Sequence, residues 1–293
     1  MHVPVMLGEC LEYLAIRPDG IFLDVTAGLG GHAGAIAQRL SALSKTAGGF
    51  VIANDRDAES LELARQNTAQ WADRIRFHHG SFSELRATLG EMGIERVDGL
   101  LADLGVSRYQ LTEPERGFSL MADGPLDMRQ NRGQELTADE IVNFTPEKEL
   151  ADLIFQLGEE RRSRRISRAI VRARPIHSTQ RLSRVIEVAV PRTSKIHPAT
   201  QTFQALRMAV NDEQGELDRM LASVPELVKS GGRIVILSFM SLEDRKVKQS
   251  FQALARAGRA RILTKHVVRP SSEEIKKNPP SRSAKLRALE MSD

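Results

Sequence analysis

The chain has 293 residues, enough for one large domain or two modest ones, and its 41% hydrophobic and 27% charged residues are typical of an ordinary globular protein. Its single cysteine, Cys10, excludes an intramolecular disulfide and a cysteine-rich zinc site, which suits a reducing cytoplasm. We expect no signal peptide in Met1–Leu7 and no membrane helix, because no apolar run approaches the roughly 20 residues that a span needs.

Strand-like and helix-like segments alternate through the first third of the chain. The strand-like runs are almost continuously apolar, as in a sheet covered on both faces. Strands are expected over 21–26, 50–54, 75–78 and 97–104, and helices over 31–43, 58–70 and 82–89. Four such units in succession predict a parallel sheet with right-handed crossovers.

The alternation stops after the fourth predicted strand and returns about 90 residues later. The interval has turn residues and then helical stretches, clearest over 150–157 and 166–174, the second ending near Pro175. Beyond it we expect a helix over 200–221, a strand over 233–239, a helix over 242–257, and strands over 261–268 and 283–290. The simplest organisation is an α/β core of residues 1–110 and 200–293 with a helical insertion at 111–199.

A glycine-rich turn, DVTAGLGGHAG over Asp24–Gly34, joins the first strand to its helix. Glycine allows a tight turn and the close approach of a ligand, and the helix N-terminus offers free N–H groups. Asp55 ends the next strand, where an acidic residue can accept hydrogen bonds from both ribose hydroxyls of an adenosine. The pattern therefore predicts an adenosine-containing cofactor at the carboxyl ends of the strands.

Two cofactors fit this turn. Gly28, Gly30 and Ala33 satisfy the dinucleotide fingerprint, so an NAD-dependent oxidoreductase is an alternative. Asp24, however, could face a cationic amino acid group and would repel a pyrophosphate, and the polar Asp103 at the end of the fourth strand suits an amine-methylating enzyme. The terminal strand pattern also suits the antiparallel hairpin of methyltransferase sheets. These features favour S-adenosylmethionine, and glycines that serve only tight packing are a third interpretation.

The segment from Glu159 to Lys195 holds ten arginines and one lysine against three glutamates. Such a cluster is expected where a protein binds a polyanion, and arginine is suited to forked contacts with phosphate. A solvated helix face is the alternative. We expect contact with nucleic acid.

Longer blocks of the sequence carry a resemblance to known proteins over almost the whole chain. The matching blocks are His2–Leu7, the stretch from Gly30, Asp55–Asp57, Asp103–Ser107, Gln110–Leu111, Glu115–Ser119, Asp123–Arg129, Gly158–Ile170, His197–Glu213, Gly231–Lys248 and Asn278–Ala288. DGPLDMR and SLEDR are the most specific motifs among them. These blocks resemble one family, the bacterial ribosomal RNA small subunit methyltransferase H or MraW family.

The resemblance implies a Rossmann-like class I methyltransferase sheet with an inserted helical domain for substrate recognition. It implies methyl transfer from S-adenosylmethionine to the N4 amine of a specific cytidine in the decoding region of small-subunit (16S) ribosomal RNA, in the cytoplasm and without a membrane. Naked RNA or the small ribosomal subunit as substrate, and a monomer or a homodimer, stay open. By resemblance the cofactor contacts fall on Gly30, Gly31, His32, Asp55, Phe82, Asp103 and Gln110.

The sequence departs from the family at three positions: Met240 stands where the family has histidine, Arg108 where it has serine, and Ala27 where it has phenylalanine. Met240 puts in doubt any mechanism that needs an imidazole there. It also leaves room for a catalytically silent RNA- or ribosome-binding factor, although the intact loop, Asp55 and Asp103 count against that alternative.

Asp103 is the leading catalytic candidate. The cytosine amine is a poor nucleophile because its lone pair is delocalised, and an acceptor for an amine proton would help to localise it. Asp103 could instead hold the cofactor or cap a turn. The target base must leave its stack, and Phe118 and Phe239 are candidate stacking platforms or core residues. The scattered histidines lack ligand-like spacing, so we expect no catalytic metal.

Overall fold

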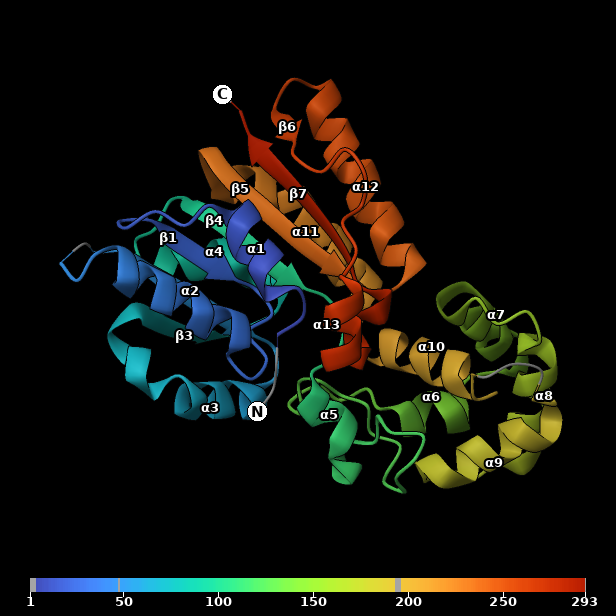
Figure 1. The fold of residues 1–293 in the computed structure, drawn as a ribbon. Helices are drawn as coiled ribbons and strands as arrows, with labels where there is room; N and C mark the ends of the chain where they lie inside the picture. Colours follow the sequence, from blue (N-terminus) through green and yellow to red (C-terminus); the bar gives the residue numbers. More distant parts are fainter. Residues whose placement is uncertain (1–3, 47, 193–195, 293) are drawn as a thin grey trace. The chain divides into compact units, whose positions relative to one another are not determined.

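The computed structural model describes residues 4–46, 48–192 and 196–292 (Figure 1). The chain divides into an α/β unit, Met1–Gly105 with Gly215–Asp293, and a helical unit, Val106–Gln214. The helical unit thus takes in residues 106–110 and 200–214, which the sequence pattern assigned to the core. His2 and Val3 of the first matching block, and Lys195 of the arginine-rich segment, lie outside the described residues.

In the described part of the chain, seven strands form one sheet in the order β3-β2-β1-β4-β5-β7-β6. The first five strands along the chain pair in parallel, and β7 pairs antiparallel with β5 and β6. The predicted parallel sheet with an antiparallel terminal hairpin is therefore confirmed. The strands are β1 Ile21–Asp24, β2 Phe50–Asp55, β3 Ile75–His79, β4 Val97–Asp103, β5 Val228–Ser238, β6 Ala260–Ile262 and β7 Lys285–Met291.

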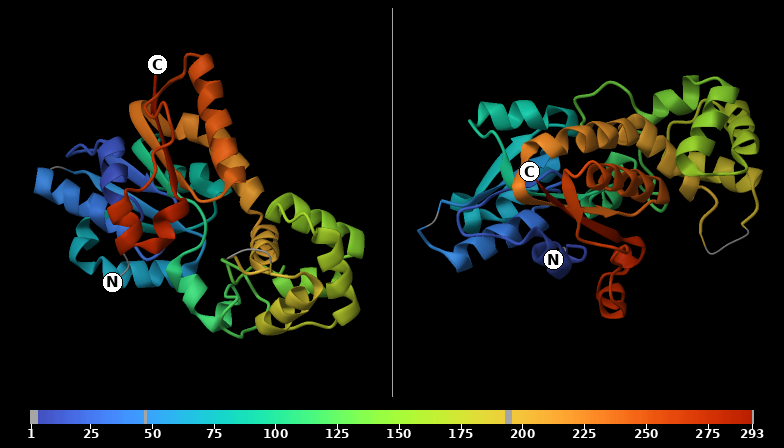
Figure 2. Two further views of the ribbon diagram at one scale, coloured as in Figure 1. Left: turned by 45° about the vertical axis from the view of Figure 1, so that its right-hand side comes forward. Right: turned by 90° about the horizontal axis from the view of Figure 1, so that it is seen from above.

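Helices cover both faces of this sheet (Figures 1 and 2). One face packs against α1, α2 and α3 and the other against α4, α11 and α12, because side chains alternate along each strand. In β4, for example, Leu100 and Ala102 join one apolar cluster and Leu101 the other. The helices of this unit are α1 Leu7–Leu14, α2 Gly31–Leu43, α3 Ala58–Asn67, η1 Ala69–Arg74, η2 Phe82–Glu84, α4 Leu85–Glu91, α11 Glu213–Leu227, α12 Ser241–Arg256, α13 Ser272–Lys277 and η4 Pro279–Ser283.

Two predicted elements were wrong in extent. The helix expected over 200–221 is two helices, because the Asn211 side chain bonds to the backbone of Met128 and Gln130 and Asp212 takes a left-handed φ of 44°. The strand expected over 261–268 is only the short β6. Beyond it the Thr264 hydroxyl accepts the Ala288 N–H at 3.0 Å, where strand backbone would otherwise pair.

The helical unit has its own apolar core. Ile166 and Ile170 of α8, and Leu182 and Ile186 of α9, are buried at the four-residue spacing of a helix face. As predicted, α8 ends before Pro175. The helices of this unit are α5 Arg108–Thr112, η3 Pro114–Arg116, α6 Ala138–Phe144, α7 Glu147–Gly158, α8 Ser163–Ala173, α9 Thr179–Ala189 and α10 Thr200–Val210.

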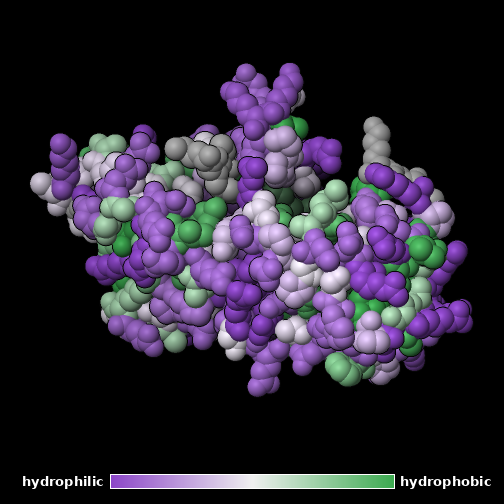
Figure 3. All heavy atoms as spheres, turned by 90° about the horizontal axis from the view of Figure 1, so that it is seen from below, coloured by the Kyte–Doolittle hydropathy of each residue, from purple (hydrophilic) through white to green (hydrophobic). Residues whose placement is uncertain are grey.

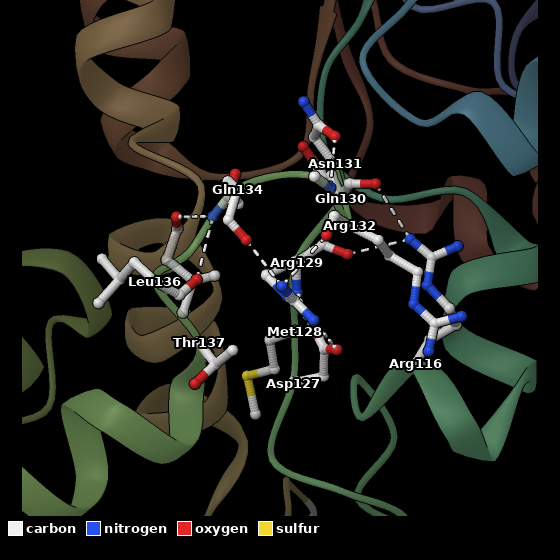
Figure 4. Close-up of polar contacts among 12 residues, drawn as sticks. Arg116, Asp127, Met128, Arg129, Gln130, Asn131, Arg132, Gln134, Leu136 and Thr137 are labelled. Carbon is white, nitrogen blue, oxygen red and sulfur yellow. Dashed lines mark hydrogen bonds and ion pairs between the residues drawn. The ribbon is translucent and has the colours of Figure 1, made fainter.

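Two of the matching blocks in this unit, ERGFS and DGPLDMR, lie in contact around Arg116 (Figure 4). The buried Arg116 of ERGFS donates to the carbonyls of Arg129 and Gln130 at 3.0 and 3.1 Å, while Asp127 and Arg129 of DGPLDMR form a two-pronged ion pair at 2.8 and 2.9 Å. Gly117 has a φ of 71°, and a Cβ there would lie 2.1 Å from the carbonyl of Pro125. These motifs therefore hold an irregular stretch of backbone in shape.

Hydrophilic side chains predominate on the face drawn in Figure 3, as expected for a surface in contact with water. Within the described ranges, no helix combines the length and the apolar character that a membrane crossing requires.

Candidate active site

Acidic residues gather at the carboxyl edge of the parallel sheet. Asp24, Asp55 and Asp103 end β1, β2 and β4, and Glu243 lies in the first turn of α12, just after β5. The carboxyl ends of parallel strands meet at one edge of a sheet, so these acidic groups lie close enough to repel one another. Asp24 is repelled by Asp55, and Asp103 is repelled by Asp24 and Glu243. The structure thus brings together the three aspartates that the sequence singled out.

The glycine-rich turn is built partly by packing. Gly30 has a φ of 84°, and a Cβ there would lie 2.9 Å from a methyl of Thr68. A Cβ on Gly31 would lie 2.5 Å from the Pro4 ring. Side chains are therefore excluded at both positions whether or not a ligand binds, and packing explains part of the pattern.

Asp55 already organises this turn. Its Oδ2 accepts the Gly28 N–H at 2.7 Å and its Oδ1 accepts the Asp57 N–H at 2.9 Å. Burial raises the pKa of Asp55 to about 6, with the two N–H donors opposing the rise. Each carboxylate oxygen has a second lone pair, so both can still accept a ribose hydroxyl.

Asp24 is fully buried and incompletely paired. Its Oδ1 accepts the Thr26 N–H at 3.1 Å, but no described residue gives a hydrogen bond to its Oδ2. Burial, reinforced by Asp55, raises the pKa of Asp24 to about 7, although backbone N–H groups of Thr26 and Ala33 oppose the rise. An unpaired buried carboxyl is costly, and a cationic group beside it would relieve the cost.

Asp103 has the same character. Its side chain is 22% exposed, yet its Oδ1 is buried and has no hydrogen-bond partner among the described residues. Burial, with repulsion from Asp24 and Glu243, raises the pKa of Asp103 to about 8. The backbone N–H of Asp103 donates to the Thr26 hydroxyl at 2.6 Å.

His32 lies beside Asp103. Its Nδ1 is 3.8 Å from the Asp103 Oδ2, and its Nε2 is 3.0 Å from the Val5 carbonyl. A carbonyl can only accept, so we assign the proton of the neutral ring to Nε2. The Nδ1 atom is then the ring nitrogen on the side of the Asp103 carboxyl group.

Glu243, in the SLEDR motif, has two roles in the structure. Its side chain is buried, and its Oε2 accepts the N–H groups of Phe239 and Met240, each at 3.1 Å. It therefore holds the start of α12 and also adds negative charge near Asp103. The family's usual histidine is replaced at Met240, whose backbone Glu243 keeps in place.

Comparison with known proteins gives the family. The sequence profile of the MraW methylase family matches residues 1–292. The chain belongs to this family. Over 99% of its length it is 63% identical to the whole of the ribosomal RNA small subunit methyltransferase H of Solibacter usitatus, and over 98% it is 50% identical to 93% of the enzyme of that name from Koribacter versatilis. A solved rRNA methylase from Streptococcus thermophilus aligns over the whole of both chains at 10% identity, with a TM-score of 0.47.

This MraW-family member is an S-adenosylmethionine-dependent methyltransferase, so the NAD-dependent alternative is wrong. The site explains the preference in physical terms. Two buried carboxyl oxygens without partners, on Asp24 and Asp103, fit a ligand that carries a cationic ammonium and a cationic sulfonium. The pyrophosphate of NAD would bring further negative charge to a site that is lined by acidic residues.

The other predicted contacts of this methyltransferase are distributed over both units. Phe82 begins η2 after β3 and packs, half-buried, against the core of the α/β unit. Gln110 belongs to the helical unit, where its Oε1 accepts the Ser107 N–H at 2.9 Å and completes the cap of α5. Their contacts with the cofactor stay predictions.

The two candidate stacking aromatics differ. Phe118 is 6% exposed and packs in the core of the helical unit, so its role there is structural. Phe239 is half-buried at the end of β5, and a Cβ on Gly105 would lie 4.0 Å from its ring. Phe239 therefore remains the better candidate for contact with a base.

Proposed function

We propose that this methyltransferase transfers a methyl group from S-adenosylmethionine to the N4 amine of a specific cytidine in the decoding region of small-subunit (16S) ribosomal RNA. The observation that carries the proposal is Asp103, a carboxyl group with a buried unpaired oxygen at the end of β4. The names of the relatives support the RNA.

The residues of the site divide the work. Asp24 would hold the ammonium group and Asp55 the ribose hydroxyls, with Gly30, Gly31, His32, Phe82 and Gln110 as further contacts. Bound there, the cofactor supplies an electrophilic methyl group on a positively charged sulfur. Holding donor and acceptor in line can supply roughly 7–11 kcal/mol of the barrier.

Asp103 would act on the acceptor. Its carboxylate accepts a hydrogen bond from an amine proton, which localises the nitrogen lone pair toward the methyl group. Burial raises the pKa of Asp103 to about 8, and the cationic cofactor would displace the proton that the group then holds near neutral pH. After transfer the positive charge on sulfur is gone, and Asp103 can take up the proton that the amine nitrogen loses. The Nδ1 of His32 lies 3.8 Å from the Asp103 Oδ2, beside the carboxyl group that takes up the proton.

The helical unit would hold the RNA. Two arginines of the basic segment serve the fold: Arg162 pairs with Glu160, and Arg174 donates to the carbonyls of Val142 and Thr145. A further arginine, Arg168, approaches Glu147 at 3.4 Å from an exposed position. We define the arginine surface as Arg161, Arg164, Arg165, Arg168, Arg172, Arg181 and Arg184, all on or beside α8 and α9.

The test is methylation in vitro with radiolabelled S-adenosylmethionine. Small ribosomal subunits and naked 16S RNA, both from cells that lack this modification, serve as substrates, and the labelled nucleotide is mapped and hydrolysed to identify the methylated atom. We expect one labelled cytidine, on its exocyclic amine. Label on another base would contradict the proposal, and binding without label would favour a silent RNA-binding factor.

A further inference from the structure

Thr26 joins the two carboxyl groups that the site depends on. It lies in the turn after β1, and its side chain reaches β4. Its hydroxyl oxygen accepts the Asp103 N–H at 2.6 Å, its own N–H donates to the Asp24 Oδ1 at 3.1 Å, and its hydroxyl lies 3.5 Å from that same oxygen. A single small side chain therefore connects the ends of two neighbouring strands.

The direction of these bonds follows from the chemistry of a hydroxyl. It has one proton to donate and lone pairs to accept with. Because an amide N–H can only donate, the Thr26 oxygen is the acceptor toward Asp103. Its proton is then available to Asp24, whose Oδ1 lies 3.5 Å from the hydroxyl oxygen.

The bond between the Asp103 N–H and the Thr26 hydroxyl stands where backbone pairing between β1 and β4 has ended. Pairing of β1 with β4 runs as far as Asp24 opposite Leu101, and the Val25 N–H still donates to the Leu101 carbonyl at 2.9 Å. Two residues further along β4, the N–H of Asp103 is taken by the Thr26 side chain instead of strand backbone. On the side of β1 the Asp103 backbone is thus held by one hydroxyl group, while on its other side β4 stays paired with β5 as far as Asp103 opposite Leu237.

We propose that Thr26 is a positioning residue for methyl transfer, whose hydroxyl sets the place of the Asp103 carboxyl group relative to that of Asp24. This inference rests on the proposed function, in which Asp24 holds the donor and Asp103 the acceptor. Their separation then controls the alignment of the reacting atoms, and a misplacement of about 1 Å can cost about 100-fold in rate.

Thr26→Val and Thr26→Ser test this role. Valine keeps the shape of threonine and removes the hydroxyl, whereas serine keeps the hydroxyl. We expect the single-turnover rate of Thr26→Val at saturating cofactor to fall about 10- to 100-fold, the size of effect that misalignment produces. Calorimetry should show S-adenosylhomocysteine affinity changed much less, and Thr26→Ser should restore most of the rate.

Thr264→Val is the matched control. The Thr264 hydroxyl also accepts a strand N–H, that of Ala288 at 3.0 Å, but it lies beyond β6 and not among the carboxyl groups. Both valine variants should lower the melting temperature, and only Thr26→Val should lower the rate. Equal rates in the two variants, or a serine variant as slow as the valine variant, would overturn the proposal.

The same assay separates this inference from the function beneath it. The parent protein is mapped on the same substrate, so label outside the cytidine amine counts against the proposed function alone, while the effect of Thr26→Val on the rate is still measured there. If Thr26→Val does not fold, Thr26→Ala is compared with Thr26→Ser in its place. An alanine variant as fast as the serine variant would equally overturn the proposal.

Discussion

The two units of this methyltransferase carry charge in opposite ways. The α/β unit buries carboxyl groups, and two of their oxygens, on Asp24 and Asp103, lack any partner in the described part of the chain. The helical unit keeps the seven arginines of the arginine surface exposed to water, where a charge costs little. A buried unpaired carboxyl is difficult to explain without a ligand, whereas an exposed arginine is compatible with water alone, so the first region supports its function more strongly.

The largest expected effect is at Asp103. Asp103→Asn keeps the size of the side chain but removes its charge and its capacity to accept a proton. We expect the single-turnover rate at saturating cofactor to fall about 100- to 10,000-fold, the usual range for acid–base assistance.

The control lies on the same strand. Asp98, at the other end of β4, pairs with Arg17 and Lys229, so Asp98→Asn should cost stability and leave the rate alone. A near-normal rate for Asp103→Asn would instead move the proton acceptor to Ser107 or a backbone carbonyl of that loop.

The sequence predicted the acidic edge because its physical basis is local. Strands that are apolar on both faces, followed directly by Asp24, Asp55 and Asp103, must bring those residues to one edge of a parallel sheet. The role of Thr26 could not be predicted in the same way, because its partner Asp103 is 77 residues away in the chain. Nothing in the local sequence distinguishes Thr26 from other threonines in turns.

Other features depended on packing that no local pattern reports. The burial of Glu243 follows from its bonds to the start of α12, and a Glu at a helix start is equally common on a surface. Phe118 was a candidate for stacking on the target base, but its side chain packs in the apolar core of the helical unit. The break at Asn211 is caused by a segment some 80 residues earlier in the chain.

The second largest effect is expected for Asp55→Ala, which should lower the affinity for the cofactor. It removes the acceptors for the ribose and also those for the Gly28 and Asp57 N–H groups. Hydrogen-bond losses of this kind cost on the order of 1–3 kcal/mol, or roughly 5- to 150-fold in affinity. Calorimetric titration with S-adenosylhomocysteine measures it, and an unchanged dissociation constant in a folded variant would sink the assignment of Asp55.

The dependence of cofactor affinity on pH tests the role of the buried carboxyl groups in the α/β unit. Burial raises the pKa values of Asp24 to about 7 and of Asp103 to about 8, so near neutrality these groups hold protons that a cationic ligand must displace. Affinity for S-adenosylmethionine should therefore rise with pH between about 6 and 8, by up to about tenfold per pH unit for each proton released. Asp24→Asn should flatten this rise, and a pH-independent affinity in the parent would contradict it.

The same groups make stability depend on pH. The folded protein binds these protons more tightly than the unfolded chain, so without ligand the free energy of unfolding should fall as pH rises from about 4 to about 8. The slope is about 1.4 kcal/mol per pH unit for each group while it is protonated in the folded state alone. Thermal melts across this range, with and without cofactor, measure it, and the ligand-bound protein should lose less stability on the alkaline side.

The smallest expected effect is on the arginine surface, where the comparison is most easily broken. Phosphate contacts release condensed counterions, so RNA affinity should fall with salt, with a logarithmic slope of about 0.7–0.9 for each contact. Each lost contact is then worth about threefold in affinity between 50 and 200 mM salt.

Replacing Arg164, Arg165 and Arg168 with Gln should flatten the slope. It should leave S-adenosylhomocysteine affinity unchanged, because these arginines belong to the helical unit and the carboxyl cluster belongs to the α/β unit. The control removes three exposed charges of the α/β unit instead, at Lys248, Arg256 and Arg259. If both triple variants keep the parental slope, the arginines are a solvated face and the RNA is held elsewhere; if both flatten it equally, net charge and not this surface sets the affinity.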